Sequence, residues 1–316
     1  MTAITTTGMT KEYGEVTAID NLNLDIEEGE VFGFLGPNGA GKSTTINILL
    51  DFVTPTSGSA TVLGSDPQKA TRELHRRIGV LPEGYELYDR LSGRKHLAFA
   101  AETKGADDDP SELLERVGLD PDEGDRKVGG YSKGMKQRLA LAAALVGDPD
   151  LLILDEPSAG LDPTGIQRMQ ELVRAEAERG TAVFFSSHIL GQVEAVCDRV
   201  GVLNDGELVA VDSIEGLRDA FGSGTTLTIE LDTIPDDALP TLPEIEGVAG
   251  YEINGTSLAV QCTTPRAKGE AISHVQTAGA TALDIHIEEA GLDVLFNKLT
   301  ATDEQRSDES VEEVVA

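Results

Sequence analysis

Residues 36–43 are the part of the chain whose types and spacing most clearly predict chemistry. They read Gly-Pro-Asn-Gly-Ala-Gly-Lys-Ser and lie between an apolar run, 31–35, and a helix-like run, 44–50. Glycines in such a turn let successive backbone N–H groups face phosphate oxygens, and the beginning of the helix adds the positive end of its dipole. Lys42 would reach the terminal phosphates, and the Ser43 hydroxyl suits a magnesium ion. The flanking strand and helix favour this phosphate-binding loop, or P-loop, over a glycine-rich turn without a ligand.

A second candidate is a pair of carboxylates, Asp155 and Glu156, directly after the apolar run 151–154. At such a strand end beside a P-loop, the aspartate is placed to hold magnesium, directly or through water. The glutamate next to it can polarise an attacking water. A solvated strand end is the alternative, but two acids beside a buried apolar run are costly without a cation, which favours the catalytic interpretation.

The segment 131–138 predicts a further anion site. It reads Tyr-Ser-Lys-Gly-Met-Lys-Gln-Arg and opens an alanine-rich helix. The Ser132 side chain and the Gly134 backbone lie at the expected helix N-terminus, where anions bind. By itself this segment is explained as well by a simple helix cap. Two phosphate-binding helix starts in one chain nevertheless suggest a nucleotide held between two subunits.

A parallel sheet is needed to position these residues. The first 220 residues alternate short apolar runs with helical patterns, which predicts an α/β fold with helices on both faces of a mainly parallel sheet. From about residue 91 to 146 we expect several helices and no strand, which we interpret as a helical insertion. The segments 5–26 and 60–63 suggest edge or antiparallel strands. The expected buried strands are 31–35, 78–81, 151–154 and 182–186.

The pattern changes at a Gly-Ser-Gly break, residues 222–224, and a small C-terminal α+β domain is expected over 225–300. Alternating apolar residues predict its strands, and Asn254-Gly255 predicts a tight hairpin. The acidic, polar stretch 301–316 is expected to be disordered. The alternating segments are 227–231, 258–262 and 283–287, and helical patterns fit 266–278 and 291–299.

Composition argues against a nucleic-acid partner. The 316 residues include 56 acidic and 25 basic side chains, for a formal charge of −31, and the acids are spread along the whole chain. Such a surface repels nucleic acid and anionic lipid, whose binding relies on clustered Lys and Arg. The same acidity, with only 10 lysines, fits a protein adapted to a high-salt cytoplasm, an ordinary acidic protein being the alternative.

Cysteine use and hydropathy give no sign of export or of membrane insertion. Cys197 and Cys262 have no metal-ligand spacing, and we expect both to be reduced. Residues 1–10 have no charged leader followed by an apolar core. The longest apolar run, 139–146, is far shorter than the roughly 20 residues of a membrane helix. Any link to a membrane is therefore expected through a partner.

Taken together, five motifs resemble those of the nucleotide-binding subunit of ATP-binding cassette (ABC) transporters. The resemblance covers about residues 3–220, and it implies a P-loop nucleotide hydrolase core with an antiparallel β edge and a helical insertion. It further implies an ATPase that uses ATP and Mg²⁺, with a second copy or a related subunit completing each site. The motifs are the P-loop, residues 131–135, Asp155-Glu156, residues 158–162 and Ser187-His188.

The resemblance also implies roles for single residues. Tyr13 is expected to stack on adenine, with an edge-strand packing residue as the alternative. Ser132 and Gly134 are expected to touch the γ-phosphate held by the opposite subunit, and Asp162 to bridge the dimer interface. His188 is expected to contact the γ-phosphate and to hold the geometry in which Glu156 activates water. The phosphates are expected to contact Gly36, Pro37, Asn38, Gly39, Ala40, Gly41, Lys42, Ser43 and Thr44.

The metal ligands expected from the resemblance are Ser43, Asp155 and Glu83. Glu83 departs from the family pattern, because a glutamine usually follows the strand that here spans 78–81. A carboxylate can still meet magnesium, but it adds charge and donates a hydrogen bond only when protonated. Lys133 also departs from the commonest spelling, in a way familiar among exporter-type members.

The implied partner is an integral membrane permease, which would hold this cytoplasmic chain at the inner face of the cell membrane. An apolar cluster around Tyr85 and Leu87 fits a groove for a short helix of that permease, with a plain core patch as the alternative. The segment 288–299 resembles the ending of exporter-type subunits. The alternative function is a soluble ABC-type ATPase not engaged in transport. DNA-repair members have long coiled coils and translation members have two cassettes, and this sequence has neither.

The acidic composition leads to a prediction about salt. Raising KCl from about 0.1 M to about 2 M should increase the thermal unfolding midpoint by about 5 °C or more, because salt screens the repulsion among dispersed carboxylates. Differential scanning calorimetry measures this midpoint. Maximal stability at the lowest salt concentration would contradict adaptation to a high-salt cytoplasm.

Overall fold

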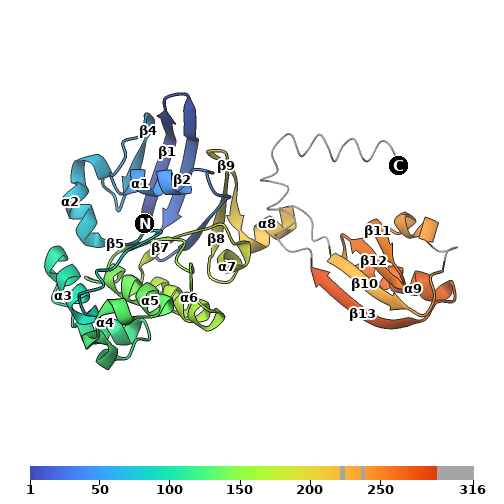
Figure 1. Cartoon of the computed structure of the whole chain (residues 1–316). Helices are drawn as coiled ribbons and strands as arrows, with labels where there is room; N and C mark the ends of the chain where they lie inside the picture. Colours follow the sequence, from blue (N-terminus) through green and yellow to red (C-terminus); the bar gives the residue numbers. More distant parts are fainter. Residues whose placement is uncertain (221–224, 236–238, 290–316) are drawn as a thin grey trace. The chain divides into compact units, whose positions relative to one another are not determined.

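The fold is given by a computed structural model that describes residues 1–220, 225–235 and 239–289. The chain divides into two compact units, Met1–Ile214 and Glu215–Ala316 (Figure 1). Each unit contains a hydrophobic core of its own. The boundary lies close to the composition change seen in the sequence.

A six-stranded sheet forms the centre of the first unit. Its strand order is β5-β6-β7-β3-β8-β9, and all neighbouring pairs are parallel except β8 and β9. The four expected buried strands are present, and the α/β fold class is confirmed. The strands β8 and β9 were not expected as strands, because Gly201 interrupts the apolar run of one and the other is only half-buried. The strands are β3 (Val31–Leu35), β5 (Ile78–Leu81), β6 (Leu151–Asp155), β7 (Ala182–Ser187), β8 (Arg199–Asn204) and β9 (Glu207–Ser213).

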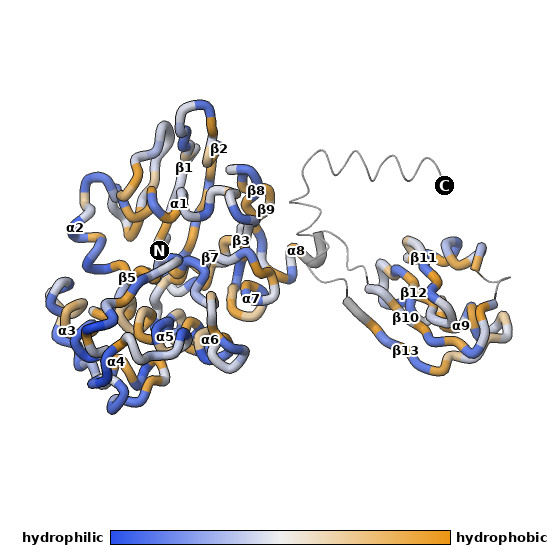
Figure 2. Tube along the Cα trace, viewed as in Figure 1, coloured by the Kyte–Doolittle hydropathy of each residue, from blue (hydrophilic) through white to orange (hydrophobic). Residues whose placement is uncertain are grey.

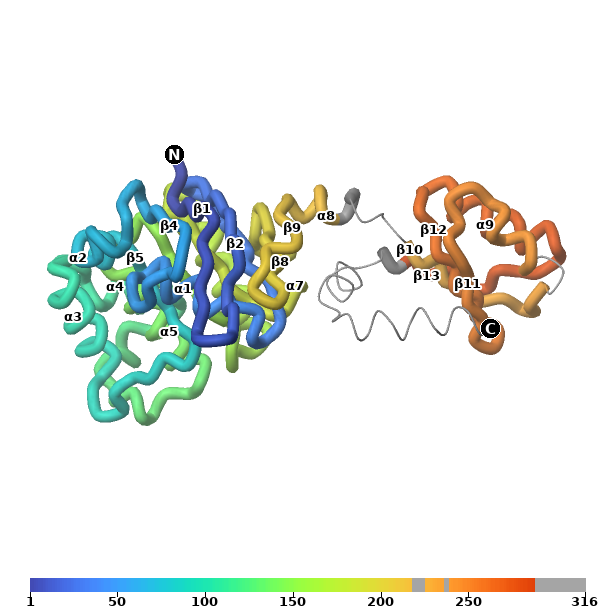
Figure 3. Tube along the Cα trace, turned by 90° about the horizontal axis from the view of Figure 1, so that it is seen from above, coloured from blue at the N-terminus to red at the C-terminus, as the bar shows by residue number. Residues whose placement is uncertain are grey.

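The expected antiparallel strands form a sheet of their own. Its order is β2-β1-β4, and Figure 3 shows β1 and β2 side by side. Buried apolar residues alternate with exposed ones along β2. One face of this sheet therefore packs into the same hydrophobic core as residues of the parallel sheet. Phe32 and Phe184 of the parallel sheet belong to that shared core. The strands are β1 (Thr2–Tyr13), β2 (Val16–Glu27) and β4 (Ser57–Val62).

Helices are the only regular elements between β5 and β6 in the described chain. Ser92, Asp109 and Ser132 cap the first turns of three of these helices with side-chain oxygens, which explains where each one begins. Figure 2 shows hydrophilic stretches around α4. The helices of this insertion are α3 (Gly93–Lys104), α4 (Pro110–Arg116) and α5 (Lys133–Ala144), with 3-10 turns η1 (Pro121–Asp125) and η2 (Val128–Gly130).

The remaining helices of the first unit lie along the chain between strands of the two sheets. The P-loop leads directly into α1, and Asp162 caps the start of α6. None of the helices in the described ranges has both the length and the apolar character that crossing a membrane requires. These helices are α1 (Lys42–Leu49), α2 (Pro67–Arg77), α6 (Pro163–Glu178) and α7 (Leu190–Glu194), and α8 (Ile214–Ala220) follows β9.

The second unit is a small α+β domain. Its antiparallel sheet has the order β11-β12-β10-β13, and Gly255, with φ 64°, makes the expected hairpin turn. Both cysteines are free, as expected. The expected helix over 291–299 and the stretch 301–316 lie outside the described residues. The elements are β10 (Thr225–Leu231), η3 (Leu239–Glu244), β11 (Val248–Asn254), β12 (Ser257–Cys262), α9 (Pro265–Thr277) and β13 (Ala282–Glu289).

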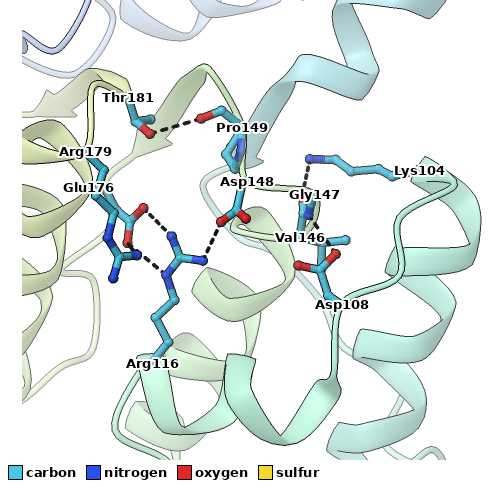
Figure 4. A network of polar contacts seen from close by, with 10 residues as sticks. All are labelled: Lys104, Asp108, Arg116, Val146, Gly147, Asp148, Pro149, Glu176, Arg179 and Thr181. Carbon is cyan, nitrogen blue, oxygen red and sulfur yellow. Dashed lines mark hydrogen bonds and ion pairs between the residues drawn. The ribbon is translucent and has the colours of Figure 1, made fainter.

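One buried ion pair fastens the helical insertion to the parallel-sheet core (Figure 4). Arg116 at the end of α4 donates from Nε to Glu176 Oε1 at 2.9 Å, and from a second nitrogen to Glu176 Oε2. It also pairs with Asp148 at 2.8 Å. The side chain of Glu176, on α6, is only 2% exposed. Removing the arginine would leave a buried carboxylate without its main partner, which is the costly way to break such a pair.

We expect Arg116→Met to lower the free energy of unfolding by about 3 kcal/mol, because the buried Glu176 then keeps only its longer 3.4 Å contact with Arg179, whose side chain is mostly exposed. Arg77→Met is the matched control, since Arg77 pairs with Asp150 at 2.6 Å but both side chains are about half exposed. That control should cost about 1 kcal/mol or less. Denaturant unfolding measures both, and equal losses would contradict a special role for the buried pair.

Candidate nucleotide site

The P-loop forms a backbone cradle between β3 and α1. Gly41 precedes α1 with φ 109°, and a side chain there would meet the carbonyl oxygen of Ala18 at 2.4 Å, so only glycine fits. No side chain caps the N-terminus of α1, and no acidic residue lies in its first turn. The N–H groups of this helix end are therefore not satisfied by a protein side chain, and they suit an anion.

Lys42 lies at the centre of the cradle. Its Nζ donates to the carbonyl oxygen of Gly36 at 2.6 Å and to that of Pro37 at 3.2 Å. The residue is 7% exposed, and Nζ lies 3.9 Å from Glu156 Oε1. Burial lowers the pKa of Lys42, while nearby carboxylates act in the opposite direction. A cation thus lies at the end of the P-loop, held by carbonyls that a phosphate can replace.

The end of β6 carries a carboxylate that is incompletely satisfied. The Oδ2 atom of Asp155 lies 3.5 Å from Ser43 Oγ, while Oδ1 is buried and without a hydrogen-bond partner within the protein as described. Burial raises the pKa of Asp155, and the charges of Glu83 and Glu156 act in the same direction, whereas the Ser186 hydroxyl and Lys42 act to lower it. A buried carboxylate oxygen beside a hydroxyl is an oxygen-rich donor set of the kind that Mg²⁺ takes, with water and phosphate oxygens completing its shell.

Glu156 and His188 meet at the same edge of the sheet. His188 Nδ1 lies 2.9 Å from Glu156 Oε1. Glu156 is 7% exposed, whereas the His188 side chain is about half exposed. Glu156 has φ 49°, in the left-handed region that a non-glycine residue rarely adopts. A backbone conformation of this kind persists only where the surrounding structure holds it, and such conformations cluster at functional sites.

Glu83 shares the electrostatic environment of these residues. It lies two residues beyond the end of β5, and Leu81 pairs with Leu154 next to the end of β6. Its charge acts to raise the pKa of Asp155, and it offsets part of the effect by which burial lowers the pKa of Lys42. The structure therefore brings Glu83 to the same edge as the predicted base and metal ligands.

Ser132, Gly134 and Asp162 form a second group. The Ser132 hydroxyl caps α5 by accepting from the backbone N–H of Met135 at 3.2 Å, and Asp162 caps α6 by accepting from Gly165 at 2.7 Å. A side chain on Gly134 would lie 3.8 Å from Leu161. Ser132 is thus a helix cap, as the simpler explanation of this segment predicted. Ser132 is exposed and Gly134 is half-buried, so a second molecule can reach the start of α5.

Tyr13 is at the exposed end of β1. The residue is 49% exposed, and Lys11 Nζ lies 4.8 Å from the ring centroid. The ring is therefore accessible to a flat ligand, which a buried packing residue would not be.

One polar side chain at this edge, Gln192 on α7, was not found by sequence reasoning. It accepts hydrogen bonds from the hydroxyls of Ser158 and Ser187. No motif marks this glutamine, because its contacts come from segments 34 and 5 residues away along the chain. Only the folded chain brings these three side chains together.

Comparison with known proteins gives the same picture as the geometry. Residues 19–159 match the family model described as ABC transporter. The bacitracin transport ATP-binding protein BcrA of Bacillus licheniformis is 44% identical over 66% of this chain and 69% of its own length. The linearmycin resistance ATP-binding protein LnrL of Bacillus subtilis (strain 168) is 33% identical over 92% of this chain and 96% of its own.

A solved structure shows the same likeness in three dimensions. It is a dimeric post-hydrolysis state of an ATP-binding cassette bound to ADP and Pi. The match has a TM-score of 0.58 at 26% identity, and covers 66% of this chain and 98% of that chain. The family model, the relatives and the solved structure thus all match the first unit to an ATP-binding cassette.

Proposed function

The chain belongs to the family of ATP-binding subunits of ABC transporters, and from this premise we propose how its own residues bind and hydrolyse ATP. Members of the family are ATPases, and two relatives are named as ATP-binding proteins of bacitracin transport and of linearmycin resistance. The proposal is an exporter ATPase in which two copies close around two ATP molecules. The observation that carries it is the meeting of Lys42, Glu156 and His188 beside the uncapped start of α1.

The P-loop binds the phosphates. Its backbone N–H groups and the start of α1 face the phosphate oxygens, and Lys42 exchanges the carbonyls of Gly36 and Pro37 for those oxygens. Tyr13 stacks on the adenine through its exposed ring. The phosphate end and the base end of the nucleotide are thereby fixed by different elements.

Ser43, Asp155 and Glu83 are the residues that would hold Mg²⁺. The unpartnered Asp155 Oδ1 supports this assignment. The ion, when bound, neutralises phosphate charge and polarises the bond to be broken. Without it, the carboxylates at this edge face Lys42 as their cation.

Glu156 is the general base in this proposal. Its carboxylate accepts the proton of the attacking water, and the water oxygen then bonds to the γ-phosphorus as the bond to the β-phosphate oxygen breaks. The contact between His188 and Glu156 Oε1 holds the carboxylate in one orientation. His188 also has an exposed face, which leaves it able to approach the γ-phosphate.

The second copy completes the site. Ser132 and Gly134 lie at the start of α5, and Asp162 lies at the start of α6 beside them. In the proposal they face the γ-phosphate held by the P-loop of the other copy. The dimeric cassette structure supports this arrangement. ATP binding then favours the closed dimer, and hydrolysis favours reopening.

An integral membrane permease is the proposed partner. The segment after β5 exposes aromatic residues: Tyr85 is 44% exposed and Tyr88 71%. Exposed aromatics are typical anchors of protein interfaces. Through this segment the subunit would lie at the inner face of the cell membrane. The dispersed carboxylates further support a high-salt cytoplasm as its surroundings.

Changing Glu156 to Gln should lower kcat for ATP hydrolysis by at least about 100-fold, because the general base is lost. ATP binding should persist, and the dimer should accumulate in its closed form. Phosphate release and size-exclusion chromatography measure these two outcomes.

Glu178→Gln, an exposed change at the end of α6, is the control and should hydrolyse ATP at the wild-type rate. Excess EDTA should stop hydrolysis by the wild type if Mg²⁺ is required. Near-normal turnover by the Glu156→Gln variant would reject this residue as the base.

Changing Tyr85 to Asp should reduce co-purification with the permease at least about tenfold, as expected for an aromatic interface anchor. ATP affinity should stay within about twofold, because the change lies outside the P-loop. Ile253→Asp, at a residue with the same 44% exposure on β11, is the matched control. Loss of ATP binding in the Tyr85 variant would instead identify Tyr85 as a core residue.

A further inference from the structure

Two serine hydroxyls next to the catalytic residues converge on one oxygen of Gln192. Ser187 Oγ donates to Gln192 Oε1 at 3.3 Å, and Ser158 Oγ donates to the same oxygen. Ser158 lies two residues after Glu156, and Ser187 directly precedes His188. One side chain on α7 therefore joins the segment that follows β6 to the segment that follows β7.

Both serine hydroxyls are buried, so each needs a hydrogen-bond acceptor within the protein. Ser158 is 6% exposed and Ser187 is fully buried. Ser187 Oγ also accepts from the backbone N–H of Ile189 at 3.0 Å, which shapes the turn that carries His188. A buried hydroxyl that loses its acceptor must move to find another, so the loss of Gln192 Oε1 would disturb both segments.

The segment after β6 forms a tight turn. The backbone N–H of Ala159 donates to the carbonyl oxygen of Glu156 at 3.1 Å, and Glu156 itself is held at φ 49°. Its own N–H donates to the carbonyl oxygen of Ser186 on β7 at 3.1 Å. Ser158 lies inside this turn, so its bond to Gln192 adds a side-chain restraint to the strained backbone of the proposed base.

We propose that Gln192 is a positioning residue for ATP hydrolysis, which holds Glu156 and His188 in register through Ser158 and Ser187. The two catalytic side chains touch at 2.9 Å, and each lies within two residues of a serine that Gln192 binds. The glutamine thus links the two segments that carry Glu156 and His188 through their serines. This inference rests on the ATPase function proposed above.

The acceptor oxygen is the feature of Gln192 that matters. Both serines donate to Oε1, so a glutamate at this position offers the same acceptor at the same reach, whereas a leucine of similar size offers none. Gln167 on α6 is a matched control position, because it is exposed and its side-chain nitrogen donates to Glu171 of the same helix.

The test compares Gln192→Leu, Gln192→Glu and Gln167→Leu in the full chain, with kcat and KM for ATP measured in the presence of Mg²⁺. Gln192→Leu should lower kcat at least about tenfold, the scale expected for misplaced catalytic groups, and should change KM less than about twofold. Gln192→Glu and Gln167→Leu should keep kcat within about threefold of the wild type.

A second readout does not depend on turnover. Hydrogen exchange of the Ile189 amide, which donates to Ser187 Oγ, should become faster in Gln192→Leu and stay slow in Gln192→Glu. If the leucine variant does not fold, Gln192→Asn replaces it, since its shorter side chain withdraws the same oxygen; the same losses are expected.

Wild-type kcat in the leucine variant, or equal losses in the leucine and glutamate variants, would overturn the inference. A wild-type chain that does not hydrolyse ATP would instead reject the proposed function, and the exchange of the Ile189 amide would still decide whether Gln192 restrains this segment.

Addition of Ser158→Ala and Ser187→Ala to Gln192→Leu should cause no further loss of kcat, because the same restraint has already been removed.

Discussion

The parallel pairing of β3, β6 and β7 is the constraint on which the nucleotide site depends. Leu35 at the end of β3 pairs with Ser187 on β7, and Asp155 at the end of β6 pairs with Ser186. The carboxyl ends of the three strands therefore stop at one level, and each is followed by a functional segment. Open parallel sheets place ligands at this edge for the same reason. The contacts of Glu156 with Lys42 and His188 follow directly from this register.

The charges at this edge favour the cation of the proposed function. Asp155, Glu156 and Glu83 surround one buried ammonium group, that of Lys42, and one oxygen of Asp155 is without a partner in the described structure. Burying such groups costs stability unless they are paired. Negative charge therefore exceeds positive charge at this edge, and the Mg²⁺ of the proposed function would offset it. Stability elsewhere comes from the apolar core and from the satisfied pair of Arg116 and Glu176.

Local spacing predicted which motifs lie together at one edge of the sheet, and tertiary contacts explain what it could not predict. The P-loop and the Asp155-Glu156 pair were found because each motif is contiguous and each follows a continuous apolar strand. The separate antiparallel sheet was not foreseen, since alternation along β1 and β2 shows that one face is buried but not which layer covers it. Gln192 has no motif, and its contact with Ser158, 34 residues away, forms only when β6 and β7 are paired.

In the proposed function, one chain holds only half of an ATP site. The most direct measurement is an experimental structure of the Glu156→Gln variant with Mg-ATP, by electron microscopy or crystallography. We expect two nucleotides in a closed dimer, with each γ-phosphate contacted by Lys42 of one copy and by Ser132 and Gly134 of the other. ATP held by one chain alone, with Ser132 and Gly134 of a second copy far from its phosphates, would contradict it.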